Sequence, residues 1–291
     1  MIAGHTVRAA DGWRLSVLDL VPDGPARGLV IAGHAMMVDR RTLHRTGRPC
    51  LAEALRAAGL RVLVPDLRGH GASGPTAGDG GDWSYDQLVE DTAALVAFAR
   101  ALAPELRLAT LGHSLFGHTT LAWLTRAADA PIAAHVALCC EVWAREAEDR
   151  RFAWPLKRLV LGAAAASARL VGAVPTRRIG LGSADEAFSY FADFARWARD
   201  GGWRARDGHD YLAGLSALRL PVLLVQSDGD RIAPPRTALR LWSRLPAAEV
   251  WRLGRPPWQH LAPGHMAAVT DPASAPLWHA VAAWLVRRLA P

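Results

Sequence analysis

Short apolar runs alternate along the chain with longer stretches in which apolar residues recur every three or four positions. The short runs predict strands at 6–9, 14–21, 28–32, 61–65, 106–111, 132–140, 222–226 and 249–253. The longer stretches predict helices at 47–58, 84–102, 115–127 and 236–245, and a last helix with one apolar face made of Leu277, Val281, Trp284, Leu285 and Leu289. Strands that alternate with helices are typical of a mostly parallel sheet with crossover helices, so we predict an α/β fold.

This alternation breaks between residues 141 and 217. The stretch contains apolar helical segments and four tryptophans but no clear strand–helix unit. We therefore predict one α/β domain with an inserted helical cap. Residues 1–140 form the first part of the core, 141–217 the cap and 218–291 the second part. The cap follows about the sixth strand of the sheet.

Composition excludes several classes of protein. Hydrophobic residues make up 51% of the 291 residues and charged residues 21%, which indicates a globular chain. The net charge of +7 comes from arginines spread along the chain, with Lys157 as the lone lysine, and no nucleic-acid motif accompanies them. We expect no nucleic-acid partner. Three cysteines and the absence of a charged-then-apolar leader favour a cytoplasmic location.

The strongest chemical signal is Gly112-His113-Ser114-Leu115-Phe116-Gly117, which lies between a predicted strand and a predicted helix. A serine hydroxyl becomes a good nucleophile only when a base takes its proton. A sharp turn from strand to helix exposes the hydroxyl, and the following backbone N–H then points at the developing oxyanion. This segment therefore predicts a nucleophile elbow centred on Ser114.

Three further loops, together with this elbow, resemble the motifs of a known superfamily. They are Gly33-His34-Ala35-Met36, then Ser227-Asp228-Gly229-Asp230 with Pro234 beyond it, and Gly264-His265-Met266. With the loop Pro65-Asp66-Leu67-Arg68-Gly69-His70-Gly71-Ala72-Ser73, they make the chain similar to the α/β-hydrolase superfamily over nearly its whole length. The resemblance implies an α/β-hydrolase fold with a triad in the order Ser, Asp, His. It implies roles for Ser114 (nucleophile), Asp230 (acid), His265 (base), and the Met36 and Leu115 amides (oxyanion hole).

Rivals exist for two members of this triad. Asp228 or Glu141 could be the acid instead of Asp230, although Pro234 favours Asp230. His260 could be the base instead of His265, although Gly264 favours His265. We expect no metal, because the histidines lack carboxylate or cysteine partners at ligand spacing. We expect no cofactor, because the mechanism of the triad requires none.

The substrate pocket is predicted to involve His34, Phe116, Trp143, Trp154 and Trp197. Phe116 departs from the superfamily pattern, which prefers a small residue there, so its ring either repacks the elbow or forms a pocket wall. The cap tryptophans either line an acyl or aromatic pocket or bury the cap against the core. Residues 156–174 could lie on a membrane surface as lipase lids do, but we expect a helix packed on the core and no membrane contact.

Residues 171–199 narrow the resemblance to bacterial hydrolases near the serine aminopeptidase and monoacylglycerol lipase group. The predicted function is a serine hydrolase that cleaves an ester, thioester or lactone through an acyl-enzyme on Ser114. Its partner would be a small acyl substrate, apolar or aromatic. The alternatives are an acyltransferase with the same triad and a non-catalytic ligand-binding relative. No residue pattern indicates an oligomeric state.

Overall fold

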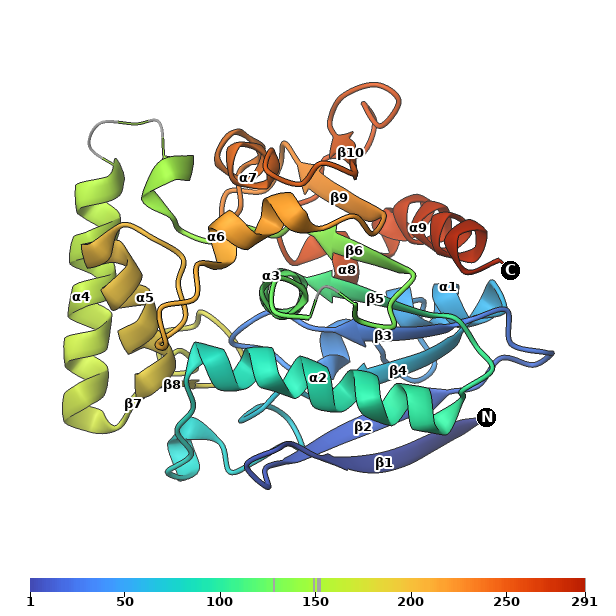
Figure 1. Ribbon diagram of the computed structural model, residues 1–291, viewed down its shortest axis with the longest axis horizontal. Helices are drawn as coiled ribbons and strands as arrows, with labels where there is room; N and C mark the ends of the chain where they lie inside the picture. Colours follow the sequence, from blue (N-terminus) through green and yellow to red (C-terminus); the bar gives the residue numbers. More distant parts are fainter. Residues whose placement is uncertain (128, 149, 151–152, 291) are drawn as a thin grey trace.

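An eight-stranded sheet forms the centre of the computed structural model, which describes residues 1–127, 129–148, 150 and 153–290 (Figure 1). The strand order is β1-β2-β4-β3-β5-β6-β9-β10. The strands are β1 (Ile2–Arg8), β2 (Arg14–Leu20), β3 (Leu29–Gly33), β4 (Arg61–Pro65), β5 (Leu108–His113), β6 (Ala134–Leu138), β9 (Val222–Ser227) and β10 (Ala248–Leu253). The predicted α/β class is confirmed.

The sheet is parallel except at one edge, where β1 pairs antiparallel with β2 and β2 with β4. Gly33 of β3 pairs with Gly112 of β5, and His113 pairs with Leu138 of β6. The carboxyl ends of these three strands therefore meet at one edge of the sheet. In open α/β sheets, that edge is where ligand-binding loops gather.

Helices cover both faces of the sheet. One face packs against α2 (Tyr85–Leu102), α3 (Leu115–Leu124) and α7 (Pro235–Trp242). The other packs against α1 (Leu51–Ala57), α8 (Ala267–Thr270) and α9 (Ala275–Leu289). The five residues predicted to form the apolar face of the last helix are all buried.

Two helix starts show how local sequence sets an element's boundary. Ser84 and Gln87 have capping-box spacing, and both reciprocal hydrogen bonds of that motif are present at the start of α2. The first predicted helix, 47–58, begins later than expected, at Leu51. Gly47 has a φ of 73° and Pro49 follows, so the chain turns before the helix can begin.

Residues 141–217 lie between β6 and β9, and we call them the cap segment. The cap segment contains α4 (Ala153–Val171), a short hairpin of β7 (Ala173–Val174) and β8 (Glu186–Ala187), α5 (Phe188–Asp200) and α6 (Tyr211–Gly214). Figure 1 shows α5 lying between α4 and the core. The insertion follows β6, the sixth strand in chain order, and its role as a cap stays a prediction.

Helix α4 differs from the expectation of a helix packed on the core. Its buried side chains are Trp154, Leu161 and Ala168, a stripe with seven-residue spacing. Its exposed large apolar side chains are Leu156, Leu159, Val160, Leu170 and Val171. Because α5 separates α4 from the core, only one stripe of α4 has a surface to pack against. None of the described helices is long and apolar enough to cross a bilayer.

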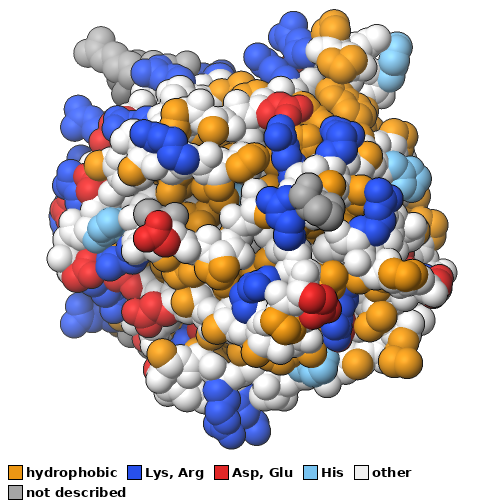
Figure 2. All heavy atoms as spheres, turned by 45° about the vertical axis from the view of Figure 1, so that its right-hand side comes forward, with side chains coloured by type: hydrophobic (Ala, Val, Ile, Leu, Met, Phe, Trp, Pro, Cys, Tyr) orange, Lys and Arg blue, Asp and Glu red, His pale blue; other side chains and the backbone are white. Residues whose placement is uncertain are grey.

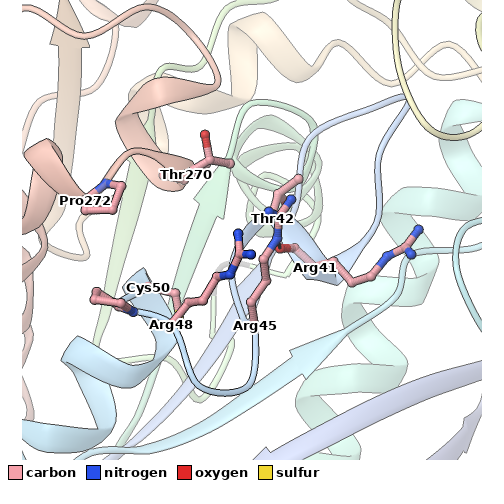
Figure 3. A pocket seen from close by; sticks show the side chains of 9 residues that line it. Arg41, Thr42, Arg45, Arg48, Cys50, Thr270 and Pro272 are labelled. Carbon is pink, nitrogen blue, oxygen red and sulfur yellow. Dashed lines mark hydrogen bonds between the residues drawn. The ribbon is translucent and has the colours of Figure 1, made fainter.

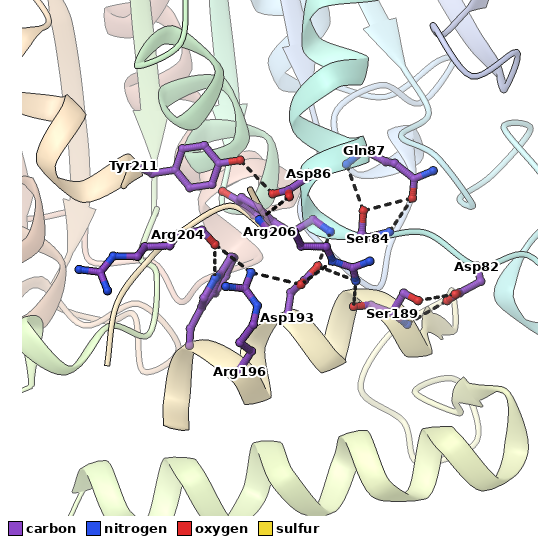
Figure 4. Close-up of polar contacts among 12 residues, drawn as sticks. Asp82, Ser84, Asp86, Gln87, Ser189, Asp193, Arg196, Arg204, Arg206 and Tyr211 are labelled. Atoms are coloured by element: carbon purple, nitrogen blue, oxygen red, sulfur yellow. Dashed lines mark hydrogen bonds and ion pairs between the residues drawn. The ribbon is translucent and has the colours of Figure 1, made fainter. Parts of the chain in front are cut away.

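Polar side chains attach α5 to the core (Figure 4). The Asp193 carboxylate accepts a hydrogen bond from the Tyr85 N–H at 3.0 Å and pairs with Arg206 at 2.9 Å. Ser189 donates from its backbone N–H to the Asp82 carboxylate at 2.9 Å. These contacts join the cap segment to the start of α2 and the loop before it.

An aromatic cluster fills the same seam, centred on the buried ring of Tyr85. The Trp197 ring stands edge-on to it, with centroids 4.7 Å apart and planes at 83°. The other members are His118, Tyr190, Trp203 and Tyr211, whose centroids lie 5.6 to 6.4 Å from that of Tyr85. The seam between cap segment and core therefore contains both polar contacts and packed aromatic rings.

The basic side chains form no continuous stripe on the face shown in Figure 2, where they are scattered among apolar and acidic side chains. Many arginines are paired in acid–base contacts, such as Arg61 with Asp19 at 2.6 Å and Arg126 with Asp207 at 2.7 Å. This scatter matches the even spread of arginines along the sequence.

Candidate active site

Ser114 occupies a strained turn between β5 and α3. Its φ of 51° lies in a region that residues with a side chain rarely adopt. Two glycines permit the turn. A Cβ on Gly112 would overlap the backbone of Gly117, and a Cβ on Gly117 would overlap the Sγ of Cys140. Strand and helix therefore approach closely, and the half-buried Ser114 stands at the apex of an elbow.

His265 and Asp230 form a buried pair beside this strand edge. The Nδ1 of His265 lies 2.7 Å from the Oδ2 of Asp230. The other oxygen, Oδ1, accepts the backbone N–H groups of Ile232 at 2.8 Å and Ala233 at 2.9 Å. Burial raises the pKa of Asp230, but His265 and these two amides outweigh burial, and the net pKa is lowered. The carboxylate therefore stays ionised and fixes the orientation of the ring.

Two close contacts join the loop that carries Asp230 to the loop that carries His265. The Ser227 hydroxyl donates to the carbonyl of Pro263 at 2.6 Å, and a Cβ on Gly229 would overlap the carbonyl of Ala262. The buried His113 ring contacts the carbonyl of His265 through Nε2 at 3.0 Å. Burial lowers the pKa of His113 to about 3, so this ring is neutral and donates that hydrogen bond. The His113 ring therefore holds the backbone of His265 in place.

The rival residues Asp228, Glu141 and His260 contact other groups. Asp228 pairs with Arg252 at 2.8 Å and Arg255 at 2.9 Å. Glu141 faces Lys157 at 3.7 Å, and burial raises its pKa to about 7. His260 is exposed next to Gln259. Of the candidate acids and bases, the structure brings together Asp230 and His265.

The loop after β3 carries Met36, the first predicted oxyanion donor. His34 holds its start, because Nδ1 contacts the carbonyl of Ala35 at 2.7 Å and Nε2 accepts the N–H of Leu67 at 2.9 Å. The Phe116 N–H donates to the carbonyl of His34 at 3.3 Å, which ties this loop to the elbow. Met36 and Leu115 thus sit on two backbone segments that are hydrogen-bonded to each other.

Comparison with known proteins gives this arrangement a family. Residues 26–253 match the family of serine aminopeptidases, S33. The chain belongs to the S33 family. Over 122 residues it is 33% identical to a monoacylglycerol lipase of Mycolicibacterium smegmatis, a match that covers 42% of this chain and 41% of that lipase.

Solved structures similar to this S33 chain share its fold. A monoacylglycerol lipase from Paleococcus ferrophilus aligns with a TM-score of 0.64 and 18% identity, over 94% of this chain and 99% of that one. An esterase from Thermogutta terrifontis aligns with a TM-score of 0.62 and 19% identity, over 99% of each chain. The α/β-hydrolase fold is therefore confirmed.

Four of the five side chains predicted for the substrate pocket of this S33-family protein are buried, and for Phe116 and the cap tryptophans packing is the alternative that the sequence had left open. His34 is fully buried, and both its ring nitrogens contact backbone groups. Phe116 is 1% exposed because its ring fills the space left by Gly33, where a Cβ would overlap it. Trp197 is buried in the aromatic cluster. Trp154 is buried too, on α4, whereas Trp143 is half-buried beneath Lys157.

A cavity of about 130 Å³ lies between the segment that precedes α1 and the residues of and after α8 (Figure 3). Arg41, Arg45 and Arg48 line one side of it and Thr270 and Pro272 the other. The predicted triad contributes nothing to this lining. Across the described ranges of the S33 chain, no group of three or more His, Cys, Asp or Glu is placed to hold a metal ion.

Proposed function

We propose that this protein is a serine hydrolase that cleaves a carboxylic ester through an acyl-enzyme on Ser114. The observation that carries the proposal is the His265–Asp230 pair, joined at 2.7 Å at the sheet edge where Ser114 occupies a left-handed elbow. The order Ser, Asp, His along the chain is the order used by α/β-hydrolases.

In this mechanism the Nε2 of His265 takes the proton of the Ser114 hydroxyl while Oγ attacks the acyl carbon. The Met36 and Leu115 N–H groups stabilise the tetrahedral oxyanion. When that intermediate collapses, the bond to the alcohol oxygen breaks and His265 returns its proton to the leaving alcohol. Water, deprotonated by His265, then attacks the acyl carbon, releases the acid and restores Ser114.

Asp230 orients the base. By accepting the Nδ1–H of His265, its carboxylate leaves Nε2 free as the proton acceptor and stabilises the imidazolium that forms. The two backbone N–H groups on Oδ1 prevent the carboxylate from rotating away. The lowered pKa of Asp230 keeps this charge present through the neutral pH range.

The substrate we propose is a small acyl ester with an apolar or aromatic group. The named relatives, a monoacylglycerol lipase and an esterase, act on esters and support this class. We propose that residues 141–217 act as a cap over the site, with Trp143 as the aromatic side chain available to the substrate. A cytoplasmic location belongs to the same proposal and is supported by three free, buried cysteines.

Intact-mass spectrometry after incubation with a fluorophosphonate tests the proposal. We expect one phosphonyl adduct on the wild type and none on Ser114→Ala, together with hydrolysis of p-nitrophenyl esters by the wild type alone. Esters of rising acyl-chain length then define the substrate. A folded wild-type protein that forms no adduct would contradict the proposal and favour a non-catalytic binding protein.

A further inference from the structure

A carboxylate from the cap segment reaches the loop that carries the proposed oxyanion donor. Glu186 of β8 is fully buried, and its Oε1 accepts the backbone N–H of Met37 at 2.5 Å. The two residues are 149 positions apart in the sequence. Met37 directly follows Met36, so this contact fixes the peptide next to the proposed donor.

Met37 needs such support because its backbone is strained. Its φ of 62° lies in the left-handed region, which is unfavourable for a residue with a side chain. The neighbouring cap residues hold the other end of the same residue. The Met37 carbonyl accepts the N–H groups of Ser183 at 2.8 Å and Ala184 at 2.9 Å. Gly182 packs so closely that a Cβ there would overlap that carbonyl.

A buried histidine balances the charge of Glu186. The Nε2 of His70 lies 3.0 Å from Oε1 of Glu186, and its Nδ1 lies 2.7 Å from the carbonyl of Arg68. Both ring nitrogens face acceptors, so the ring is doubly protonated against the carboxylate. Among the described residues, Oε2 of Glu186 has no hydrogen-bond partner, so the carboxylate acts on Met37 and His70 through one oxygen.

We propose that Glu186 is a positioning residue that holds the Met37 backbone and thereby aims the Met36 N–H into the oxyanion hole. The oxyanion hole is then complete only when residues 182–186 of the cap segment are docked on the loop after β3. Cap position and catalytic competence are coupled through the contacts that residues 182–186 make with Met37, and Glu186 supplies the side-chain contact among them. This inference rests on the proposed function.

The first test is the kinetics of Glu186→Ala and Glu186→Gln on a p-nitrophenyl ester. Removal of the carboxylate frees the Met37 peptide, and we expect kcat to fall about 10- to 100-fold while KM changes less than about threefold. Glutamine keeps an acceptor oxygen for the Met37 N–H, so it is expected to restore most of kcat. The rate of phosphonylation of Ser114 should fall in parallel with kcat.

Two further variants separate positioning from loss of a buried charge. Gly182→Ala displaces the cap segment from the Met37 carbonyl without altering a titratable group, and we expect the same kcat loss. Ser189→Ala is the matched control, because it removes a different hydrogen bond between cap and core, at Asp82. Folded Glu186→Ala and Gly182→Ala proteins with unchanged kcat would overturn the proposal, and so would an equal loss in Ser189→Ala.

Amide hydrogen exchange distinguishes failure of this inference from failure of the proposed function. The Met37 N–H should be protected in the wild type and in Glu186→Gln, and should exchange faster in Glu186→Ala. If the wild type forms no adduct but this pattern is seen, the hydrolase proposal fails and the positioning role stands. If Ser114 reacts but Met37 protection is the same in all three proteins, the positioning role fails.

Discussion

Two buried histidine–carboxylate pairs lie near one edge of the sheet in the described part of the chain, and they differ in the contacts of the second ring nitrogen. In the His265–Asp230 pair, Nδ1 contacts the carboxylate at 2.7 Å, and within the described part of the chain Nε2 has no hydrogen-bond partner. In the His70–Glu186 pair, Nε2 contacts the carboxylate at 3.0 Å and Nδ1 contacts a carbonyl. The first ring is anchored on one side, and the second on both.

This difference separates a ring that can move a proton from a ring that keeps one. A general base needs a free lone pair within reach of the proton it takes. His265 has that freedom, whereas His70 is enclosed by acceptors and serves as a fixed cation. A buried histidine beside a carboxylate is therefore no sign of a catalytic base until its other nitrogen is examined.

The largest expected effect comes from changing the acid of the first pair. Asp230→Asn keeps the shape of the side chain, but its amide can donate to Nδ1 of His265 and so favour the tautomer with the proton on Nε2. We expect kcat for ester hydrolysis to fall about 10³- to 10⁴-fold with the fold retained. Asp228→Asn is the control, with activity within about twofold of the wild type, since its partners are two surface arginines. A loss below tenfold in Asp230→Asn would contradict the assignment.

The second pair should matter for stability. His70→Ala leaves the Glu186 carboxylate buried without its counterion, which typically costs about 3–5 kcal/mol. Urea unfolding should show this as a lower transition midpoint. His5→Ala, which breaks a partly exposed pair with Asp19, should cost only about 0–1 kcal/mol. Equal losses in the two variants would remove the distinction between the pairs.

The smallest expected effect is a difference in pH dependence. Burial lowers the pKa of His70, but the carboxylate of Glu186 and the carbonyl of Arg68 outweigh burial, and the net pKa is raised. The folded protein then binds a proton more tightly than the unfolded chain. The stabilisation is complete below the unfolded pKa near 6.5 and is lost as pH rises through the folded pKa, with a slope of at most about 1.4 kcal/mol per pH unit. Asp230 has the opposite dependence, because its pKa is lowered and its contribution is lost in acid.

Unfolding free energies measured from about pH 6 to 9 test this slope. His70→Gln should be less stable than the wild type at pH 6 and should approach it as pH rises. A wild-type curve parallel to that of the variant would show that His70 does not carry the charge. Glu186→Gln should flatten the curve in the same way.

Much of the fold could be predicted from local patterns. The strands of the parallel sheet appear as short apolar runs, and a serine three residues before a glutamine marked the start of α2. The predicted elbow residues lie where their glycines require, since Gly112 and Gly117 leave no room for a Cβ. Such features depend on neighbours in the sequence, so periodicity and spacing reveal them.

The contacts of Glu186 with Met37 and His70 could not be predicted in the same way. Glu186 lies 116 positions from His70, and neither residue stands in a motif that points to the other. The hairpin of β7 and β8 consists of two-residue strands, too short for a periodic signal. For a related reason, the sequence left open whether Phe116 repacks the elbow or forms a pocket wall. Gly33 could be identified as small, but not as the surface on which that ring packs.

The aromatic cluster around Tyr85 is expected to give the protein a characteristic near-ultraviolet circular dichroism spectrum. Electronic transitions of closely packed rings couple, and their near-ultraviolet circular dichroism depends on the angles between the rings. Trp197 and Trp203 belong to the cap segment, whereas Tyr85 and His118 belong to the core. Separation of the cap segment from the core would change this spectrum even if the sheet stayed folded. The same rings that pack the cap segment therefore report its position, without any added label.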